Sequence, residues 1–337
     1  MKIKISDNTK VYVACPANKA TGGPELLHQI VYQLRKLNID ALMYYYNSRG
    51  KINPIHNAYS HYENPFTNFV SDSKENILIV PEINTNLLSN YKKIQKIIWW
   101  LSVDNYYAWT RPFQFSKIYL YKIFFFFRYF KTEFILNKHF EEPINHLVQS
   151  YYALEHLLSH KINKNQISYL SDYLNKDFLA SFNRRSTQKN NLVIYNPKKG
   201  FQFTQKLIAV AKNINFVPIQ NMSRNEVISL LSRAKVYIDF GSHPGKDRIP
   251  REAAVLGACV ITNLRGSAGN AKDLPIPIKY KFNETEENIP RILSLVEDCL
   301  NNYENNNINF DSYRRVIYSE PKKFNSDLKS IFKSSIK

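Results

Sequence analysis

Cysteine is scarce and scattered in this chain of 337 residues. Cys15, Cys259 and Cys299 lie far apart, and there is no Cys-x-x-Cys pair and no cluster of cysteine with histidine. Disulfide frameworks and structural zinc sites need paired or clustered ligands, so we expect neither. Reduced cysteines in a cytosolic protein are the simplest interpretation.

Long apolar runs are missing as well. No stretch of the sequence reaches about 18 uncharged apolar residues, the length that a membrane-spanning helix needs. The first ten residues, MKIKISDNTK, contain no apolar run of signal-peptide length. We therefore expect a cytoplasmic protein without a simple secretion signal or a membrane span.

Acidic residues are few beside basic ones. The chain has 28 Asp and Glu against 46 Lys and Arg, which gives a formal net charge of +18. This balance favours polyanionic neighbours, namely nucleic acid, an anionic membrane surface or phosphate-bearing small molecules, without choosing among them. The 44% of apolar residues is enough to fill two cores and argues against a disordered chain.

Stretches that suit buried strands alternate along the chain with stretches of helical apolar spacing. The second half shows this most clearly. Parallel α/β sheets are built from such alternation, and 337 residues are too many for one ordinary domain. We therefore predict two Rossmann-like, doubly wound domains at 1–180 and 190–305, with a C-terminal segment at 306–337 that packs back on the first domain.

Residues 241–252, GSHPGKDRIPRE, connect a predicted strand to a predicted helix. Glycines let backbone N–H groups approach an anion, and the N-terminus of a helix attracts phosphate. Lys246, Arg248 and Arg251 add positive charge where a diphosphate could lie. Glu252, in the first turn of the helix, could accept hydrogen bonds from ribose hydroxyls. The alternative is a solvated loop whose acidic residue interacts with the helix dipole.

This segment and the following AAVLGACVIT resemble the donor-binding region of GT-B glycosyltransferases, in which a glutamate opens a helix of the form E-A-x-x-x-G-x-x-V-I. Five residues match that form: Glu252, Ala253, Gly257, Val260 and Ile261. The resemblance implies two domains that face a cleft, the first on the acceptor side and the second binding a nucleotide sugar. It implies a ribose-binding role for Glu252 and is strongest to bacterial enzymes of capsule or lipopolysaccharide assembly.

Two further motifs of the family follow in the expected order. Gly22 and Gly23 come after the first predicted strand and resemble the glycine loop that faces the donor phosphate. Residues 196–200, NPKKG, resemble the family's Lys-Gly element, which implies that Lys199 contacts the diphosphate. The resemblance also places Ser267 beside the donor sugar or base, although a plain flexible loop would show the same residues.

One departure from the family leaves the stereochemical outcome open. Many retaining members carry a second glutamate eight positions before the ribose-binding one, and Pro244 stands there in this chain. Ser242, His243 and Gly245 could supply the phosphate contacts in its place.

An inverting transfer needs a base that takes the proton of the acceptor hydroxyl. Asp104 is a candidate because it follows a predicted strand of the first domain, and Glu25 and His243 are others. The alternative for Asp104 is a helix-capping or turn carboxylate. His28 is a further candidate, and for it a structural role on the face of a helix is favoured over a catalytic one. No Asp-x-Asp sequence occurs, so we expect neither a metal nor any other cofactor, with cations near the diphosphate stabilising the leaving nucleotide.

Residues 113–135 mix aromatic rings with lysine and arginine. This composition suits docking on an anionic membrane surface, although an aromatic core helix or a platform for single-stranded nucleic acid would also explain it. We expect a glycosyltransferase, peripheral to the inner membrane, that transfers sugar to a glycan or lipid-linked acceptor. No recognised nucleic-acid motif is present, so no nucleic-acid partner is expected. The alternative function is a non-catalytic protein that binds nucleic acid or another anionic polymer.

Overall fold

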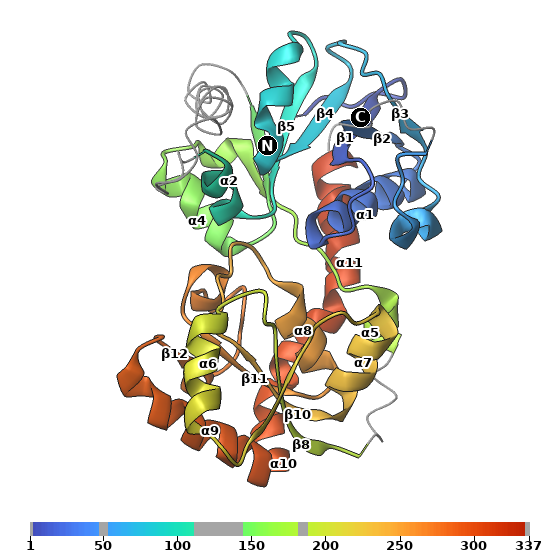
Figure 1. The fold of residues 1–337 in the computed structure, drawn as a ribbon. Coiled ribbons are helices and arrows are strands. Elements are labelled where there is room, and N and C mark those ends of the chain that lie inside the picture. Colours follow the sequence, from blue (N-terminus) through green and yellow to red (C-terminus); the bar gives the residue numbers. More distant parts are fainter. Residues whose placement is uncertain (1–2, 47–52, 111–143, 181–187, 334–337) are drawn as a thin grey trace, which may run out of the picture. The chain divides into compact units, whose positions relative to one another are not determined.

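The computed structural model describes residues 3–46, 53–110, 144–180 and 188–333 (Figure 1). Two compact units divide the chain: Met1–Asp172 with Lys322–Lys337, and Tyr173–Pro321. The first unit thus ends earlier than the expected boundary at 180, and the second extends past 305. The reason for the second difference is that Phe310, Tyr313 and Ile317 are buried in the core of the second unit.

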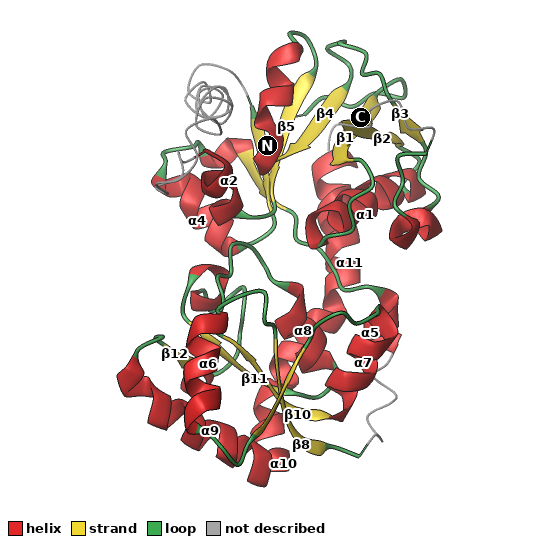
Figure 2. Cartoon of the chain, in the orientation of Figure 1, coloured by secondary structure: helices red, strands yellow, loops and turns green. Residues whose placement is uncertain are grey.

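The first unit is built on a parallel sheet of seven strands in the order β3-β2-β1-β4-β5-β6-β7. Figure 2 shows these strands with helices around them. The strands are β1 Lys10–Pro16, β2 Asp40–Tyr46, β3 Phe66–Thr67, β4 Ile77–Pro81, β5 Gln95–Trp100, β6 Asn145–Val148 and β7 Ile167–Tyr169. The helices are α1 Gly22–Lys36, α2 Val103–Thr110 and α4 Tyr151–Ser159, with 3₁₀ segments η1 Asn57–Tyr62, η2 Glu82–Asn90 and η3 Lys164–Gln166.

The apolar spacing of α1 explains how it is held on this sheet. Leu26, Leu27, Ile30, Val31 and Leu34 recur at helical spacing, and all five are buried. Complete burial of one such side chain stabilises a fold by about 1.5–3 kcal/mol. Packing of this face places the N-terminus of α1 just beyond the carboxyl end of β1.

The second unit contains a parallel sheet of five strands in the order β12-β11-β10-β8-β9. The strands are β8 Asn190–Tyr195, β9 Asn215–Pro218, β10 Ala234–Asp239, β11 Cys259–Asn263 and β12 Lys281–Phe282. The helices are α5 Lys176–Ala180, α6 Phe201–Val210, α7 Arg224–Arg233, α8 Arg248–Val255, α9 Ile289–Asn301, α10 Tyr303–Asn307 and α11 Asp311–Lys333, which continues into the first unit. The described residues of this unit also form the 3₁₀ segments η5 Gly266–Gly269, η6 Ile278–Tyr280, η7 Glu286–Asn288 and η8 Ile308–Phe310.

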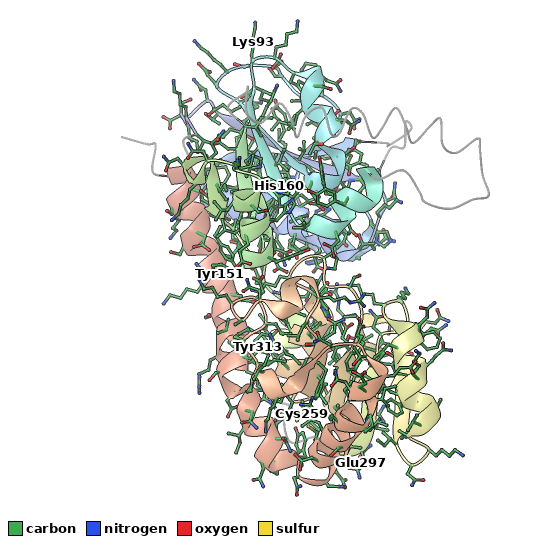
Figure 3. All side chains as sticks on the ribbon, turned by 90° about the vertical axis from the view of Figure 1, so that its left-hand side faces the viewer. Lys93, Tyr151, His160, Cys259, Glu297 and Tyr313 are labelled. Atoms are coloured by element: carbon green, nitrogen blue, oxygen red, sulfur yellow. The ribbon has the colours of Figure 1, made fainter. Side chains whose placement is uncertain are left out.

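Helices cover both faces of this sheet, α6 and α9 on one side and α7 and α8 on the other (Figure 1). Cys259 and Tyr313 lie in the interior of the unit, whereas Glu297 points outward (Figure 3). The chain leaves β8 toward β9 at one edge and later returns to β10 on the other side of β8. In open α/β sheets, such a switch point opens a crevice at the carboxyl ends of the two strands, which is where ligands bind. The predicted α/β fold with two parallel sheets is thus confirmed.

None of the helices described is both long and apolar enough to cross a membrane. The aromatic and basic stretch at 113–135 lies outside the described residues.

Candidate functional site

Two loops meet at the switch point of the second unit, one after β8 and one after β10. Gly200 ends the first loop in a left-handed conformation, with φ of 61°. A Cβ atom added to Gly200 would collide with the backbone carbonyl of Phe240, and one on Gly241 would collide with the side chain of Lys199. Both positions therefore need glycine, and the resulting close approach brings Lys199 to the 241–247 loop.

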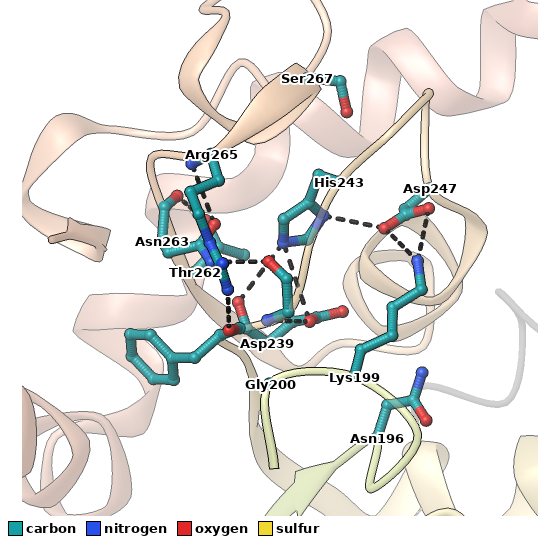
Figure 4. A network of polar contacts seen from close by, with 12 residues as sticks. Asn196, Lys199, Gly200, Asp239, His243, Asp247, Thr262, Asn263, Arg265 and Ser267 are labelled. Atoms are coloured by element: carbon teal, nitrogen blue, oxygen red, sulfur yellow. Dashed lines mark hydrogen bonds and ion pairs between the residues drawn. The ribbon is translucent and has the colours of Figure 1, made fainter. Parts of the chain in front are cut away.

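Lys199 forms an ion pair with Asp247, the last residue before α8. Its Nζ lies 2.8 and 3.0 Å from the two carboxylate oxygens of Asp247 (Figure 4). Nδ1 of His243 lies 2.9 Å from one of the same oxygens. The positive charges on Lys199 and His243 outweigh the effect of burial on Asp247, and its pKa is lowered. The expected phosphate-contacting Lys199 is therefore held in place by a carboxylate of the same site.

Asp239 supports the other side of the His243 ring. It ends β10, and its Oδ1 lies 3.7 Å from Nε2 of His243. Asp239 also accepts hydrogen bonds from the Tyr237 hydroxyl at 2.8 Å and the Gly241 N–H at 3.0 Å. Burial raises the pKa of Asp239, and the charge of His243 opposes that rise. Burial lowers the pKa of His243, but the hydrogen bond to Asp247 and the charges of both carboxylates outweigh burial and raise it.

Asp239, His243 and Asp247 place donor atoms within 4.8 Å of one another, close enough to suggest metal ligands. Other groups already occupy these atoms. Asp239 accepts from Tyr237 and Gly241, and Lys199 supplies the positive charge beside Asp247. We interpret the three residues as part of an ion-pair network rather than as a metal centre.

Lys246 and Arg251, two cations that we expected near the diphosphate, form ion pairs with Glu320. Nζ of Lys246 lies 2.6 Å from Oε1 of Glu320, and Nη1 of Arg251 lies 2.9 Å from Oε2 of the same residue. All three side chains are buried. Arg251 also donates to the backbone carbonyls of Asp247 and Lys246. These contacts attach the loop to α11 and fix its shape.

Arg248 begins α8, and Glu252 lies one turn further along the helix, not in the first turn where it was expected. Nη2 of Arg248 lies 3.8 Å from Oε1 of Glu252, one helical turn away. The side chain of Arg248 is 18% exposed and that of Glu252 only 9%, and the positive end of the helix dipole lies close to them. A cation and a carboxylate at a helix N-terminus can together bind a phosphate and a hydroxyl-bearing group.

Ser267 anchors the loop from η5. Its hydroxyl donates to the carbonyl of Gly245 at 2.5 Å, and its N–H donates to the carbonyl of His243 at 2.9 Å. Ser267 is buried, whereas Ser242 is exposed at the surface of the loop. Ser267 therefore shapes the site from behind, and of the two serines Ser242 is the accessible one.

The candidates of the first unit lie at the carboxyl ends of β1 and β5. Gly22 and Gly23 begin α1, and a Cβ on Gly23 would lie 3.8 Å from the Leu101 side chain, an ordinary contact. Glu25 is buried and accepts a 3.4 Å hydrogen bond from the Tyr62 hydroxyl. Asp104, half-buried in the first turn of α2, accepts a 2.8 Å hydrogen bond from Tyr152. The part that each plays in catalysis stays a prediction.

His28 has the surroundings of a core histidine. Its Nε2 lies 3.1 Å from the Tyr45 hydroxyl, and its ring lies 4.8 Å from that of Tyr59 and 5.8 Å from that of Tyr62. Burial lowers its pKa to about 4. A neutral, enclosed ring of this kind stabilises the packing of α1 against its neighbours.

The sequence interpretation missed four acidic residues. The sequence could have indicated Asp239 and Asp247, because Asp239 lies at the end of a predicted strand and Asp247 lies in the loop at 241–252. Glu320 carried none, because it meets Lys246 across 74 positions of sequence. Glu82, buried after β4, accepts the Leu101 N–H at 2.9 Å, and burial raises its pKa to about 8.

No protein-family model matches the chain, and no curated protein matches its sequence. Solved structures do match its fold. HepE of Anabaena, in complex with UDP-glucose, aligns at a TM-score of 0.60 and 9% identity over 96% of this chain and 99% of its own. A glycosyltransferase from Rickettsia africae aligns at 0.55 and 13% identity over 98% and 100%. Sucrose-phosphate synthase from Thermosynechococcus elongatus aligns at 0.54 and 11% identity over 96% and 100%.

These similarities, together with the two parallel sheets, define the fold as GT-B, with two Rossmann-like domains. At identities of 9–13% they establish the fold and leave the reaction to be argued from the residues of the site.

Proposed function

We propose that the protein is a glycosyltransferase that moves a sugar from a nucleotide-sugar donor to a glycan or lipid-linked acceptor. The observation that supports this most strongly is the arrangement after β8 and β10, where Lys199, Arg248 and Glu252 lie around the N-terminus of α8. HepE, which shares the fold, has been determined with UDP-glucose and with UDP.

The donor diphosphate would lie against Lys199, Arg248 and the first N–H groups of α8, with Glu252 accepting hydrogen bonds from the ribose. The acceptor hydroxyl attacks the anomeric carbon, the bond from that carbon to the diphosphate oxygen breaks, and the nucleoside diphosphate leaves. Its developing negative charge is stabilised by the two cations and the helix N-terminus. This stabilisation needs no metal ion.

Asp104 is the base that we propose for an inverting reaction. Of the candidates it is the one with a half-exposed side chain, whereas Glu25, His28 and His243 are buried. Tyr152 donates a hydrogen bond to one oxygen of Asp104, and among the described residues none donates to the other oxygen, which is the one proposed to accept a proton. In a retaining reaction Asp104 would have no such role.

We further propose a place in the synthesis of a bacterial surface polysaccharide, in the cytoplasm and peripheral to the inner membrane. The net charge of +18 supports this, because cytoplasmic leaflets carry anionic lipids.

Thermal-shift screening of the full chain against nucleoside diphosphates and nucleotide sugars tests this function. A ligand present at 100 times its Kd adds about 2.7 kcal/mol of stability. We expect at least one nucleotide sugar to raise the Tm and to be hydrolysed or transferred slowly. Glu252→Ala should weaken that ligand roughly tenfold or more, since hydrogen bonds to a charged group are lost.

Glu297→Ala is the matched control, because Glu297 is an exposed helical glutamate of the same unit (Figure 3). Salt-sensitive binding to arbitrary oligonucleotides, without affinity for any nucleotide sugar, would instead indicate a protein that binds anionic polymers.

A further inference from the structure

Four alternating charges run from the surface of the second unit toward its core. They are Lys199, Asp247, His243 and Asp239, in that order (Figure 4). Their side chains are 31%, 20%, 2% and 2% exposed. Lys199 is the most accessible member and the one that a ligand meets first. The groups behind it act on a ligand through Lys199.

The two carboxylates flank His243 on opposite sides of its ring. Asp247 faces Nδ1 at 2.9 Å, and Asp239 faces Nε2 at 3.7 Å from its carboxylate and 3.5 Å from its carbonyl oxygen. All of these oxygens are acceptors. A neutral imidazole has one N–H and could donate to only one side, whereas the protonated ring donates to both. The geometry of the site therefore favours the charged form of His243.

Two further cations near His243 share one carboxylate. Lys246 and Arg251 are both paired with Glu320 of α11, and the N–H of Ser267, which meets the His243 carbonyl from η5, is neutral. Lys199 is the cation that opposes protonation of the ring, and its charge acts from the far side of Asp247. The two carboxylates prevail, so the pKa of His243 lies above the ordinary value of 6.5.

We propose that donor binding is linked to a proton on His243, so that the protein binds the diphosphate of a nucleotide sugar more tightly when this ring is charged. The inference rests on the proposed function. With a neutral ring, the negative charge of Asp247 is offset by Lys199 alone, and Lys199 is less available to a phosphate. A charged ring shares in offsetting Asp247, and Lys199 can then pair with the ligand. His243 is in this way a positioning residue.

The direction of the pH effect follows from linkage. A bound anion favours the charged ring, so the pKa of His243 is higher in the complex than in the free protein, and binding takes up a proton between these two pKa values. Affinity should therefore be highest at low pH and should fall as the pH rises through the raised pKa of His243, above 6.5. One added charge close to the diphosphate should change affinity about tenfold, the equivalent of one pKa unit of coupling.

Isothermal titration of the full chain at constant ionic strength, between pH 5.5 and 9, measures this effect, and ~0.15 M salt screens remote charges. UDP-glucose and GDP-mannose serve as probes because a diphosphate esterified at both ends does not titrate in this range. We expect a single downward step of about tenfold in affinity. Within the step, the binding enthalpy should depend on the ionisation enthalpy of the buffer, which reports proton uptake.

His243→Gln should abolish the step and the proton uptake, and its affinity should equal that of the wild type at high pH. His160→Gln, which alters a histidine of the first unit, should keep both. Asp239→Asn keeps the ring but removes one carboxylate, so it should move the step to lower pH. This second variant provides the test if His243→Gln does not fold.

The outcomes separate the inference from the function on which it rests. If the wild type binds neither probe at any pH, nor any other nucleotide sugar, the proposed function fails. If the wild type binds a nucleotide sugar with an affinity independent of pH, or if His243→Gln or Asp239→Asn leaves the step where it was, the linkage to His243 is wrong and the function stands.

Discussion

Glu82 shows what complete burial does to a single carboxyl group. Its side chain lies beneath the end of β5 and accepts the N–H of Leu101, and burial raises its pKa from 4.5 to about 8. A raised pKa for an acid means that the folded protein binds the proton more tightly than the unfolded chain. The contribution of Glu82 to stability is thus fully present below pH 4.5 and is lost as the pH rises toward 8.

Glu82→Gln should remove this pH dependence, since glutamine keeps an oxygen that accepts from Leu101 and carries no charge. We expect the variant to unfold at a higher Tm than the wild type at pH 8, with a difference that shrinks toward pH 5. Each pKa unit corresponds to about 1.4 kcal/mol at most. Glu75→Gln, at an exposed position of the same unit, is the control. A variant less stable than the wild type at every pH would show that the ionised carboxylate is required.

Glu320 lies between Lys246 and Arg251, and its neutralisation would take the charge of this carboxylate away from two buried cations. Glu320→Gln should therefore lower the free energy of unfolding by about 3–5 kcal/mol, as is typical for a broken buried ion pair. Asp327→Asn breaks the more exposed pair with Lys323 on the same helix and should cost less than about 1 kcal/mol. Urea denaturation measures both, and equal losses in the two variants would contradict the structural role of Glu320.

At the scale of elements, the alternation of strands and helices could be predicted from the sequence, because each element has its own periodic pattern of apolar residues. The capping box of α7 is an example: Ser223 and Glu226 predict the start of this helix, and both of its reciprocal hydrogen bonds are present. The sequence could not predict which loops approach each other. The contact between Lys199 and Asp247 depends on the order of strands in the sheet, which no local pattern specifies.

The turn from β8 into α6 offers a direct test of this close approach. Gly200→Ala would place a methyl group against the carbonyl of Phe240 at a φ of 61°. We expect a loss of more than about 1 kcal/mol in stability and a weaker donor affinity, because a β-carbon is disfavoured in this conformation. Gly23→Ala meets only an ordinary contact and should leave the Tm nearly unchanged. Equal Tm values for Gly200→Ala and the wild type would refute the approach of the two loops.

At the scale of the whole molecule, composition predicted two domains but misplaced their bounds. We predicted residues 306–321 to be part of a separate C-terminal segment. In the structure, aromatic and aliphatic side chains of these residues pack in the core of the second unit. Some of the lysines that contribute to the net charge also have partners inside the fold. Lys189, Lys235 and Lys281 donate to backbone carbonyls inside the second unit, so part of the positive charge stabilises the fold and is not available to a polyanion.

We propose above all that the second unit binds a nucleotide sugar through Lys199 and Glu252. Calorimetric titration of the full chain with nucleotide sugars, compared between the wild type, Lys199→Ala and Lys198→Ala, tests it most directly. Lys198 is the exposed neighbour of Lys199 and serves as the control. We predict that Lys199→Ala weakens binding at least tenfold while Lys198→Ala leaves it within about twofold. Equal affinities in all three proteins would contradict the account.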